Sequence, residues 1–173
     1  MPMAARLLLT GPPRVGKTTL VRQVVSNLGE RAGGFYTQEV RDASGRRAGF
    51  RIVTLAGEAG WLARLGRHGN HCLGKYAVDV AELDRLGVSA IRSALAQKEI
   101  VVIDEIGPME LFSEAFRAVV LEALSSPTAL LATIVARPHP WADGVKRTPH
   151  VQLIHVTVAN RDRLAVDLQR EFG

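Results

Sequence analysis

The sequence predicts an α/β fold with a mostly parallel sheet, helices on both faces and one antiparallel hairpin. Strand-like apolar runs alternate with stretches of helical periodicity along the chain. The run IVVI at residues 100–103 is continuous and β-branched, as in a parallel strand that is covered on both faces. The tetrapeptide DASG at 42–45 lies between two strand-like runs and indicates a hairpin turn.

The first elements follow closely on one another. A short apolar strand at 7–9 precedes a helix over 17–28, whose apolar residues recur at helical spacing. Gly29 stands where a left-handed cap would end this helix. Strands are expected over 35–41 and 49–55, one on each side of the turn.

The middle of the chain is less regular. Residues 57–74 are expected to form a loop, with a possible short helix around 61–65. A strand over 76–80 and a helix over 82–97 come next, and they lead into the buried strand at 100–103.

The last third returns to the strand–helix alternation. We expect a helix over 113–124 and a buried strand over 129–135. Residues 137–150 contain three prolines and are expected to form a polar loop. A final strand over 151–158 and a final helix over 160–172 complete the pattern.

The composition fits one domain over residues 1–173. Apolar residues make up 47% of the chain and charged residues 23%, and no linker or repeat interrupts the order. No apolar run approaches the roughly 18 residues of a membrane span. Cys72 is the single cysteine, so no internal disulfide can form. We therefore expect a cytoplasmic protein with no membrane contact.

The net charge of +5 favours anionic ligands in general. The basic residues are scattered, in runs of two at most, and aromatic residues make up only 5%. Both observations argue against a dedicated nucleic-acid surface. We expect no nucleic-acid partner, and we expect the protein to be a monomer.

Residues 11–18 match the phosphate-loop motif GxxxxGK[ST] without a mismatch, between an apolar strand and an amphipathic helix. Backbone N–H groups of such a loop surround a phosphate, and the helix N-terminus adds partial positive charge. Lys17 is expected to reach the outer phosphates, and the Thr18 hydroxyl to ligate Mg²⁺. This context predicts a P-loop NTPase fold with a nucleoside triphosphate, such as ATP or GTP, as substrate. The expected nucleotide contacts here are Gly11, Pro12, Pro13, Arg14, Val15, Gly16, Lys17, Thr18 and Thr19.

An acidic pair, Asp104 and Glu105, directly follows the buried strand. A carboxylate at the carboxyl end of a parallel strand points into the ligand crevice. Asp104 is therefore expected to hold Mg²⁺ through water, opposite Thr18, and Glu105 to orient or deprotonate the attacking water. Lys17 and Glu105 are the candidate catalytic residues. If Glu105 is structural, Glu110 is one of the next candidates for the water.

Longer stretches of the sequence resemble a known family. They are GFYTQEVR at 34–41, GRRAGF at 45–50, LGKY at 73–76, VIDEIGPMEL at 102–111 and NRD at 160–162. In order and spacing they resemble the small thermophile-type nucleoside-triphosphatases, a family that includes the human cancer-related nucleoside-triphosphatase. The similarity spans almost the whole chain.

The resemblance implies a small enzyme that hydrolyses nucleoside triphosphates to the diphosphate and phosphate. It also implies Mg²⁺ dependence, slow turnover and broad tolerance among ATP, GTP, CTP and UTP. By matching position, the family's two nucleotide-binding segments fall on residues 11–18 and 101–108. The second segment consists of Val101, Val102, Ile103, Asp104, Glu105, Ile106, Gly107 and Pro108.

One position departs from the family pattern, because Arg14 stands where the family usually has glycine. If this position needs a positive φ, an arginine there costs about 1–2 kcal/mol of backbone strain. The general motif allows any residue here, so we expect nucleotide binding to survive. The rate and the loop shape are what Arg14 affects.

Asn160 and Arg161 open the last helix, where the loop of a P-loop fold often lies beside the base. An amide and a flat guanidinium there are suited to holding a base loosely, although Asn160 is equally a candidate N-cap.

Four other charged residues have two interpretations each. Glu39, Arg41 and Arg47 either order water near the γ-phosphate or form ion pairs on an edge strand. Lys75 either reaches the phosphates or lies at the surface.

Two alternative functions stay open. One is a nucleotide or small-molecule kinase of the same fold, with residues 137–147 and Trp141 as its lid. The other is a nucleotide-switched binding module without significant turnover. Phosphate release without an added acceptor distinguishes hydrolysis from both.

Overall fold

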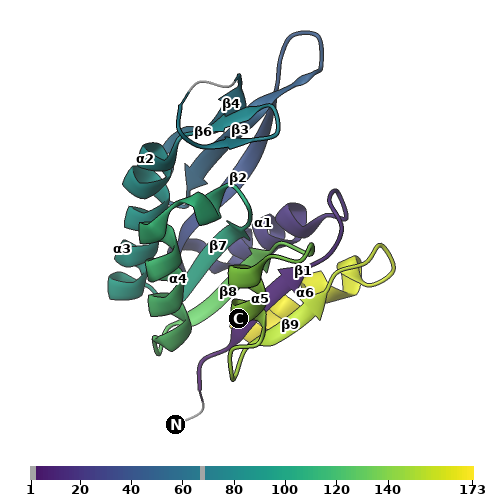
Figure 1. Cartoon of the computed structure of the whole chain (residues 1–173). Helices are drawn as coiled ribbons and strands as arrows, with labels where there is room; N and C mark the ends of the chain where they lie inside the picture. Colours follow the sequence, from purple (N-terminus) through teal and green to yellow (C-terminus); the bar gives the residue numbers. More distant parts are fainter. Residues whose placement is uncertain (1–2, 67–68) are drawn as a thin grey trace.

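A computed structural model describes residues 3–66 and 69–173 (Figure 1). Its centre is a nine-stranded sheet with the strand order β5-β6-β4-β3-β2-β7-β8-β1-β9. Helices α1 and α6 lie on one side of this sheet, and α3 and α4 on the other (Figure 1). The strands are β1 (Arg6–Thr10), β2 (Ala32–Arg41), β3 (Arg47–Thr54), β4 (Ala59–Leu65), β5 (Cys72–Leu73), β6 (Tyr76–Val78), β7 (Ile100–Ile106), β8 (Ala129–Ile134) and β9 (Gln152–His155).

The helices alternate with the strands over much of the chain. No helix in the described part of the chain is long and apolar enough to cross a bilayer. The α-helices are α1 (Lys17–Leu28), α2 (Val80–Glu82), α3 (Ser89–Gln97), α4 (Glu114–Ser125), α5 (Pro140–Lys146) and α6 (Arg161–Phe172). Shorter helical turns are η1 (Gly29–Arg31), the π-helical η2 (Leu83–Val88) and η3 (Glu110–Phe112).

The parallel half of the sheet consists of β9, β1, β8, β7 and the first part of β2. Alternate residues of its strands enter two separate cores. Leu7 and Leu9 of β1 pack with α1 and α6, whereas Leu8 packs with the α3 and α4 side. Residues 100–103 divide in the same way, which confirms the predicted strand buried on both faces.

The other half of the sheet is antiparallel, which corrects the expected mostly parallel sheet. The predicted hairpin of β2 and β3 is present, but β4, β6 and β5 extend it. Among the described strands, four neighbouring pairs are parallel and four are antiparallel. The sheet is therefore mixed, although the α/β class and the helices on both faces agree with the prediction.

Residues 57–74, expected to form a loop with a possible short helix around 61–65, instead contain strand β4 and strand β5, with residues 67–68 outside the described part. The register between β3 and β4 shifts at Phe50 and Arg51, so β4 carries a bulge. Leu62 and Ala63 are consecutive and both buried as a result. This removes the alternation by which a strand is recognised in a sequence.

Two helical segments also differ from the expectation. Residues 137–150 contain α5, whose first residue is Pro140, a position where a fixed φ and a missing N–H are tolerated. The helix expected over 82–97 starts earlier, at Val80, where the side chain of Asp79 caps it. It then contains the π-helical turn η2 before α3.

We expect Gly34→Ala to destabilise the sheet strongly. Gly34 of β2 has a φ of 118°, and a Cβ there would lie 2.0 Å from the Val102 carbonyl oxygen of β7. Overpacking and left-handed strain together predict a loss of about 2–4 kcal/mol in the free energy of unfolding, measured with urea. Gly57→Ala is the control, because Gly57 also has a positive φ (97°) but open space at its Cβ position. Equal losses would contradict a role for the contact with β7.

Candidate active site

The phosphate loop joins β1 to α1 at the carboxyl edge of the parallel strands. The Lys17 ammonium donates hydrogen bonds to the carbonyl oxygens of Gly11 (2.6 Å) and Pro12 (3.2 Å). Its side chain therefore lies over the loop. Gly16, at the start of α1, has a φ of 107°, which glycine adopts without strain.

Arg14 adopts the left-handed conformation with a φ of 64°. The position therefore has the positive φ that strains the backbone of a residue other than glycine, at a cost of about 1–2 kcal/mol. The side chains of Arg14 and Thr19 are exposed, whereas Lys17 and Thr18 are half-buried. The two half-buried side chains are the ones that the sequence predicts to bind phosphate and metal.

Asp104 lies on β7 and is only 2% exposed. Thr133, on the neighbouring strand β8, donates a hydrogen bond of 2.6 Å to Asp104 Oδ1. The Thr18 hydroxyl faces the same carboxylate and favours its ionised form. Oδ2 of Asp104 is buried and has no hydrogen-bond partner among residues 3–66 and 69–173.

These oxygens fit a magnesium ion. Mg²⁺ is a hard cation that prefers carboxylate, hydroxyl and water oxygens. The buried Asp104 Oδ2 lacks a donor, and the Thr18 hydroxyl faces that carboxylate. An ion between the two would satisfy the unpaired oxygen, which supports the predicted ligand pair.

Three charged groups from different segments share one electrostatic environment. Burial raises the pKa of both Asp104 and Glu105, and the neighbouring Lys17 ammonium opposes this for each. Burial lowers the pKa of Lys17, whereas Glu105 and Asp104 raise it. The fold thus brings the phosphate-loop lysine and the acidic pair together, 87 residues apart in the chain.

The position of the Glu105 carboxylate depends on Gly107, two residues further along the chain. A Cβ at Gly107 would lie 2.5 Å from Glu105 Oε1 and 2.8 Å from its carboxyl carbon. The Glu105 side chain therefore folds back over the Gly107 backbone. A larger residue at position 107 would displace this carboxylate, so Gly107 acts by making room for it.

Glu110 is a third acid beside the pair, and the sequence indicated it only as a substitute for Glu105. It lies on η3 and is 3% exposed. Burial, first, and the charge of Glu105, second, raise its pKa well above the ordinary value. The backbone N–H groups of Glu110 itself and of Gly107 oppose this rise.

Arg161 and Asn160 lie at the start of α6. The Arg161 guanidinium donates to the Val15 carbonyl oxygen (3.2 Å), so it contacts the phosphate loop directly. The Asn160 side chain accepts from the Thr157 N–H (2.8 Å) and donates to the His155 carbonyl (2.8 Å). Asn160 occupies the N-cap position of α6, as predicted, but its side chain orders the preceding turn and makes no cap hydrogen bond to the helix.

The other charged candidates lie in the antiparallel half. Glu39 forms ion pairs with Arg41 (2.5 Å) and Arg47 (3.0 Å), as one of the two interpretations predicted. The strands that carry them, β2 and β3, lie inside the sheet, so the expected edge position is wrong. Lys75 is exposed, and its ammonium lies 5.7 Å from the ring centre of Tyr76. Each of these four side chains, Glu39, Arg41, Arg47 and Lys75, therefore contacts another residue of the antiparallel half.

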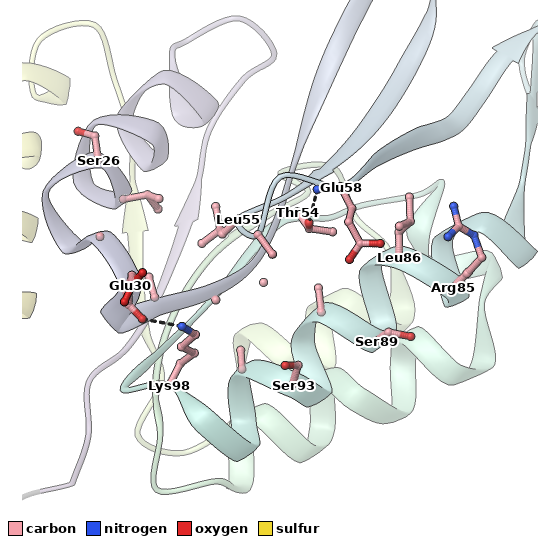
Figure 2. A pocket seen from close by; sticks show the side chains of 18 residues that line it. Ser26, Glu30, Thr54, Leu55, Glu58, Arg85, Leu86, Ser89, Ser93 and Lys98 are labelled. Atoms are coloured by element: carbon pink, nitrogen blue, oxygen red, sulfur yellow. Dashed lines mark hydrogen bonds between the residues drawn. The ribbon is translucent and has the colours of Figure 1, made fainter.

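A cavity of about 790 Å³ lies away from the phosphate loop (Figure 2). It is bounded by the end of α1, the turn between β3 and β4, and α3. Figure 2 shows Leu55 and Glu58 on one side of it and Ser89 and Ser93 of α3 on another. No residue of the candidate active site lines this cavity.

We expect Glu110→Gln to change how stability depends on pH. An acid with a raised pKa when folded keeps a proton that the unfolded chain releases, so stability falls as pH rises above about 4.5, the ordinary value. Glutamine does not titrate, so it removes this loss. The loss in the free energy of unfolding is up to about 1.4 kcal/mol per pH unit. The variant should therefore gain stability over the wild type as pH rises, measured by urea denaturation between pH 4 and 8, a range of about four units spanning that value.

Glu114→Gln is the matched control for this measurement, because Glu114 is exposed at the start of α4. Its stability should follow the wild type at every pH. If Glu110→Gln also followed the wild type, the Glu110 carboxyl would have an ordinary pKa, and the effect of burial and of Glu105 on that pKa would be disproved.

Comparison with known proteins gives a consistent result over nearly the whole chain. A family model described as "NTPase" matches residues 6–168. The nucleoside-triphosphatase THEP1 of Thermotoga petrophila is 42% identical over 163 residues, covering 94% of this chain and 90% of the relative. The human cancer-related nucleoside-triphosphatase is 39% identical over 182 residues, covering 96% and 95%.

Two solved structures show the same fold. The crystal structure of THEP1 from Aquifex aeolicus has a TM-score of 0.85 at 38% identity and covers 94% of this chain and 96% of its own. The solution structure of the human nucleoside triphosphatase has a TM-score of 0.81 at 39% identity, with 95% of each chain covered. By sequence and by structure, this chain therefore belongs to the NTPase family that includes THEP1 and the human cancer-related nucleoside-triphosphatase.

Proposed function

We propose that this protein is a Mg²⁺-dependent nucleoside-triphosphatase that hydrolyses nucleoside triphosphates to the diphosphate and phosphate. The observation that carries the proposal is the convergence of Lys17, Asp104 and Glu105 at the end of a phosphate loop. The printed names of the relatives, which are nucleoside-triphosphatases, support the same reaction.

Lys17 and the loop N–H groups bind the phosphates. The Lys17 ammonium already lies over the loop through the carbonyls of Gly11 and Pro12, so phosphate oxygens can replace these two acceptors without a large movement. Its positive charge then stabilises the negative charge that spreads over the γ-phosphate in the transition state. Thr18 and Asp104 would hold Mg²⁺, which supplies charge neutralisation at the β- and γ-phosphates.

Glu105 accepts the proton of the attacking water. As the water oxygen bonds to the γ-phosphorus, the bond from that phosphorus to the bridging oxygen breaks and the diphosphate leaves. Burial raises the pKa of Glu105 toward the pH at which a carboxylate is an effective base. Gly107 gives this carboxylate the space that it occupies.

The base contributes little to recognition in this proposal. Arg161 lies against the phosphate loop, where its guanidinium can cover a base of any kind. Asn160 uses both polar atoms of its side chain within its own turn. Neither contact reads the edge of one particular base, which agrees with broad tolerance.

The segment that a kinase would use as a lid is packed in this structure. Residues 140–146 form α5, whose Ala142 and Val145 are buried, and Trp141 packs against the core. Hydrolysis therefore fits better than transfer to an acceptor held under this segment.

We expect the protein to release phosphate from ATP, GTP, CTP and UTP with Mg²⁺, without an added acceptor. One base contact contributes about 1–3 kcal/mol, so kcat/KM should differ by less than roughly a thousandfold between bases. A coupled phosphate-release assay with and without Mg²⁺ measures this. Phosphate release only with an added acceptor would favour a kinase, and nucleotide binding without turnover would favour a switch module.

Glu105→Gln should separate chemistry from binding. Glutamine keeps the shape but cannot accept the proton, so kcat should fall about a hundredfold or more while nucleotide affinity changes only a few fold. Asp104→Asn should also weaken the dependence on Mg²⁺, because it alters a metal ligand. Single-turnover hydrolysis and Mg²⁺ titrations measure the two effects, with Glu114→Gln as the unaffected control. A Glu105→Gln enzyme with the wild-type rate would assign the water to another group, with Glu110 and Glu39 the next to test.

A further inference from the structure

On one face of the antiparallel half of the sheet, part of the surface is not covered by a helix. The strand registers place Tyr36, Arg51 and Trp61 on the same side of β2, β3 and β4. On the opposite side of the same strands, Ile52 and Leu62 are fully buried in the core. Tyr36, Arg51 and Trp61 are only half-buried. In Figure 1 these strands extend well beyond α1.

Arginines cover the aromatic rings of this open face. The guanidinium of Arg22, from α1, lies 4.9 Å from the ring centre of Tyr36. That of Arg64, on β4, lies 5.5 Å from the ring centre of Trp61. A guanidinium over a ring is weakly hydrated and presents a flat cationic surface.

The positive charge of this face is not neutralised by the protein. Arg22, Arg51 and Arg64 form no ion pair with a carboxylate in the described part of the chain. Nε of Arg51 is buried and has no acceptor among the described residues. On the other face of the same strands, Arg41 and Arg47 share the carboxylate of Glu39. The open face therefore offers cations and flat surfaces to an outside ligand.

We propose that this open face, formed by Arg22, Tyr36, Arg51, Trp61 and Arg64, binds single-stranded nucleic acid. The backbone phosphates of the nucleic acid would pair with the three guanidinium groups that have no carboxylate partner. Its unstacked bases would stack on the aromatic rings and on the guanidinium planes above them. Double-stranded nucleic acid keeps its bases stacked inside and would use only the charges. An acidic peptide would likewise leave the aromatic surfaces without a role.

The proposal revises the expectation from the sequence that nucleic acid is not a partner. Scattered basic residues and few aromatics argued against a binding surface. The fold, however, brings Arg22 of α1 together with residues of three strands, up to 42 positions further along the chain. The amino-acid composition alone does not show which arginine and aromatic side chains the fold brings together.

The charge of the face is tested with a labelled single-stranded oligonucleotide of about 16 nucleotides, the upper range for one binding module. The variant carries Arg22→Gln, Arg51→Gln and Arg64→Gln together, and fluorescence anisotropy measures Kd. We expect Kd to rise at least tenfold and the slope of log K against log salt to fall by about two, since each lost contact contributes about 0.7.

The matched control carries Arg92→Gln, Arg163→Gln and Arg170→Gln, which remove the same charge from exposed positions elsewhere. Its Kd should stay within twofold of the wild type. Both variants should release phosphate from ATP at the wild-type rate without oligonucleotide, which shows that they are folded and keeps this test separate from the proposed hydrolysis. Equal losses in both variants would overturn the proposal, because binding would then follow net charge only.

The aromatic contribution is tested at Trp61. Trp61→Leu should weaken binding about fivefold or more, and Trp61→Phe should retain most of it, since stacking needs a ring and tolerates any base. In a Trp141→Phe background, Trp61 is the remaining tryptophan, and the oligonucleotide should quench its fluorescence. An abasic oligomer, polyglutamate or anionic vesicles that bind as tightly as the oligonucleotide would disprove nucleic-acid binding.

Discussion

The burial of two carboxylates beside Lys17 is the constraint on which the rest of the structure depends. Asp104 and Glu105 lose hydration at the end of β7, and such a loss is tolerated only where opposite charge and hydrogen-bond donors compensate for it. The compensation comes from elements far apart in the sequence, with Thr133 on β8 and Lys17 at the start of α1. Three parallel strands in register are what bring these groups to one edge.

Strand β2 connects this edge to the proposed nucleic-acid surface. Its first residues pair with β7, and its remaining residues pair with β3. The side chains on one side of β2 enter the core, and those on the other side form part of the open face with α1. The candidate catalytic edge and the proposed nucleic-acid surface therefore share one continuous strand, while their charged residues remain separate.

The sequence predicted what depends on local spacing and missed what depends on the register between distant strands. The phosphate loop, the strand before Asp104 and the hairpin at 42–45 have short, nearly unambiguous signals, and the structure contains all three. Strand β4 was missed because its bulge makes neighbouring residues point the same way. The role of Gly107 depends on the Glu105 side chain folding back over the loop, which spacing does not encode. The burial of Glu110 beside Glu105 likewise depends on the tertiary fold. The Arg22–Tyr36 contact joins a helix to a strand, so it too was invisible in the sequence.

The position of β1 has a consequence for the order of folding. Strand β1 precedes the other described strands in this sequence, yet its two neighbours in the sheet are β8 and β9, with Arg6 opposite Leu130 and Leu7 opposite Gln152. The antiparallel strands pair with close neighbours in the chain, and local contacts of that kind form fastest. During folding the meander of β2 to β6 can thus form early, while β1 stays unpaired until residues 129–134 and 152–155 join the sheet. The phosphate loop, which follows β1, accordingly reaches its final position only after these later strands have paired.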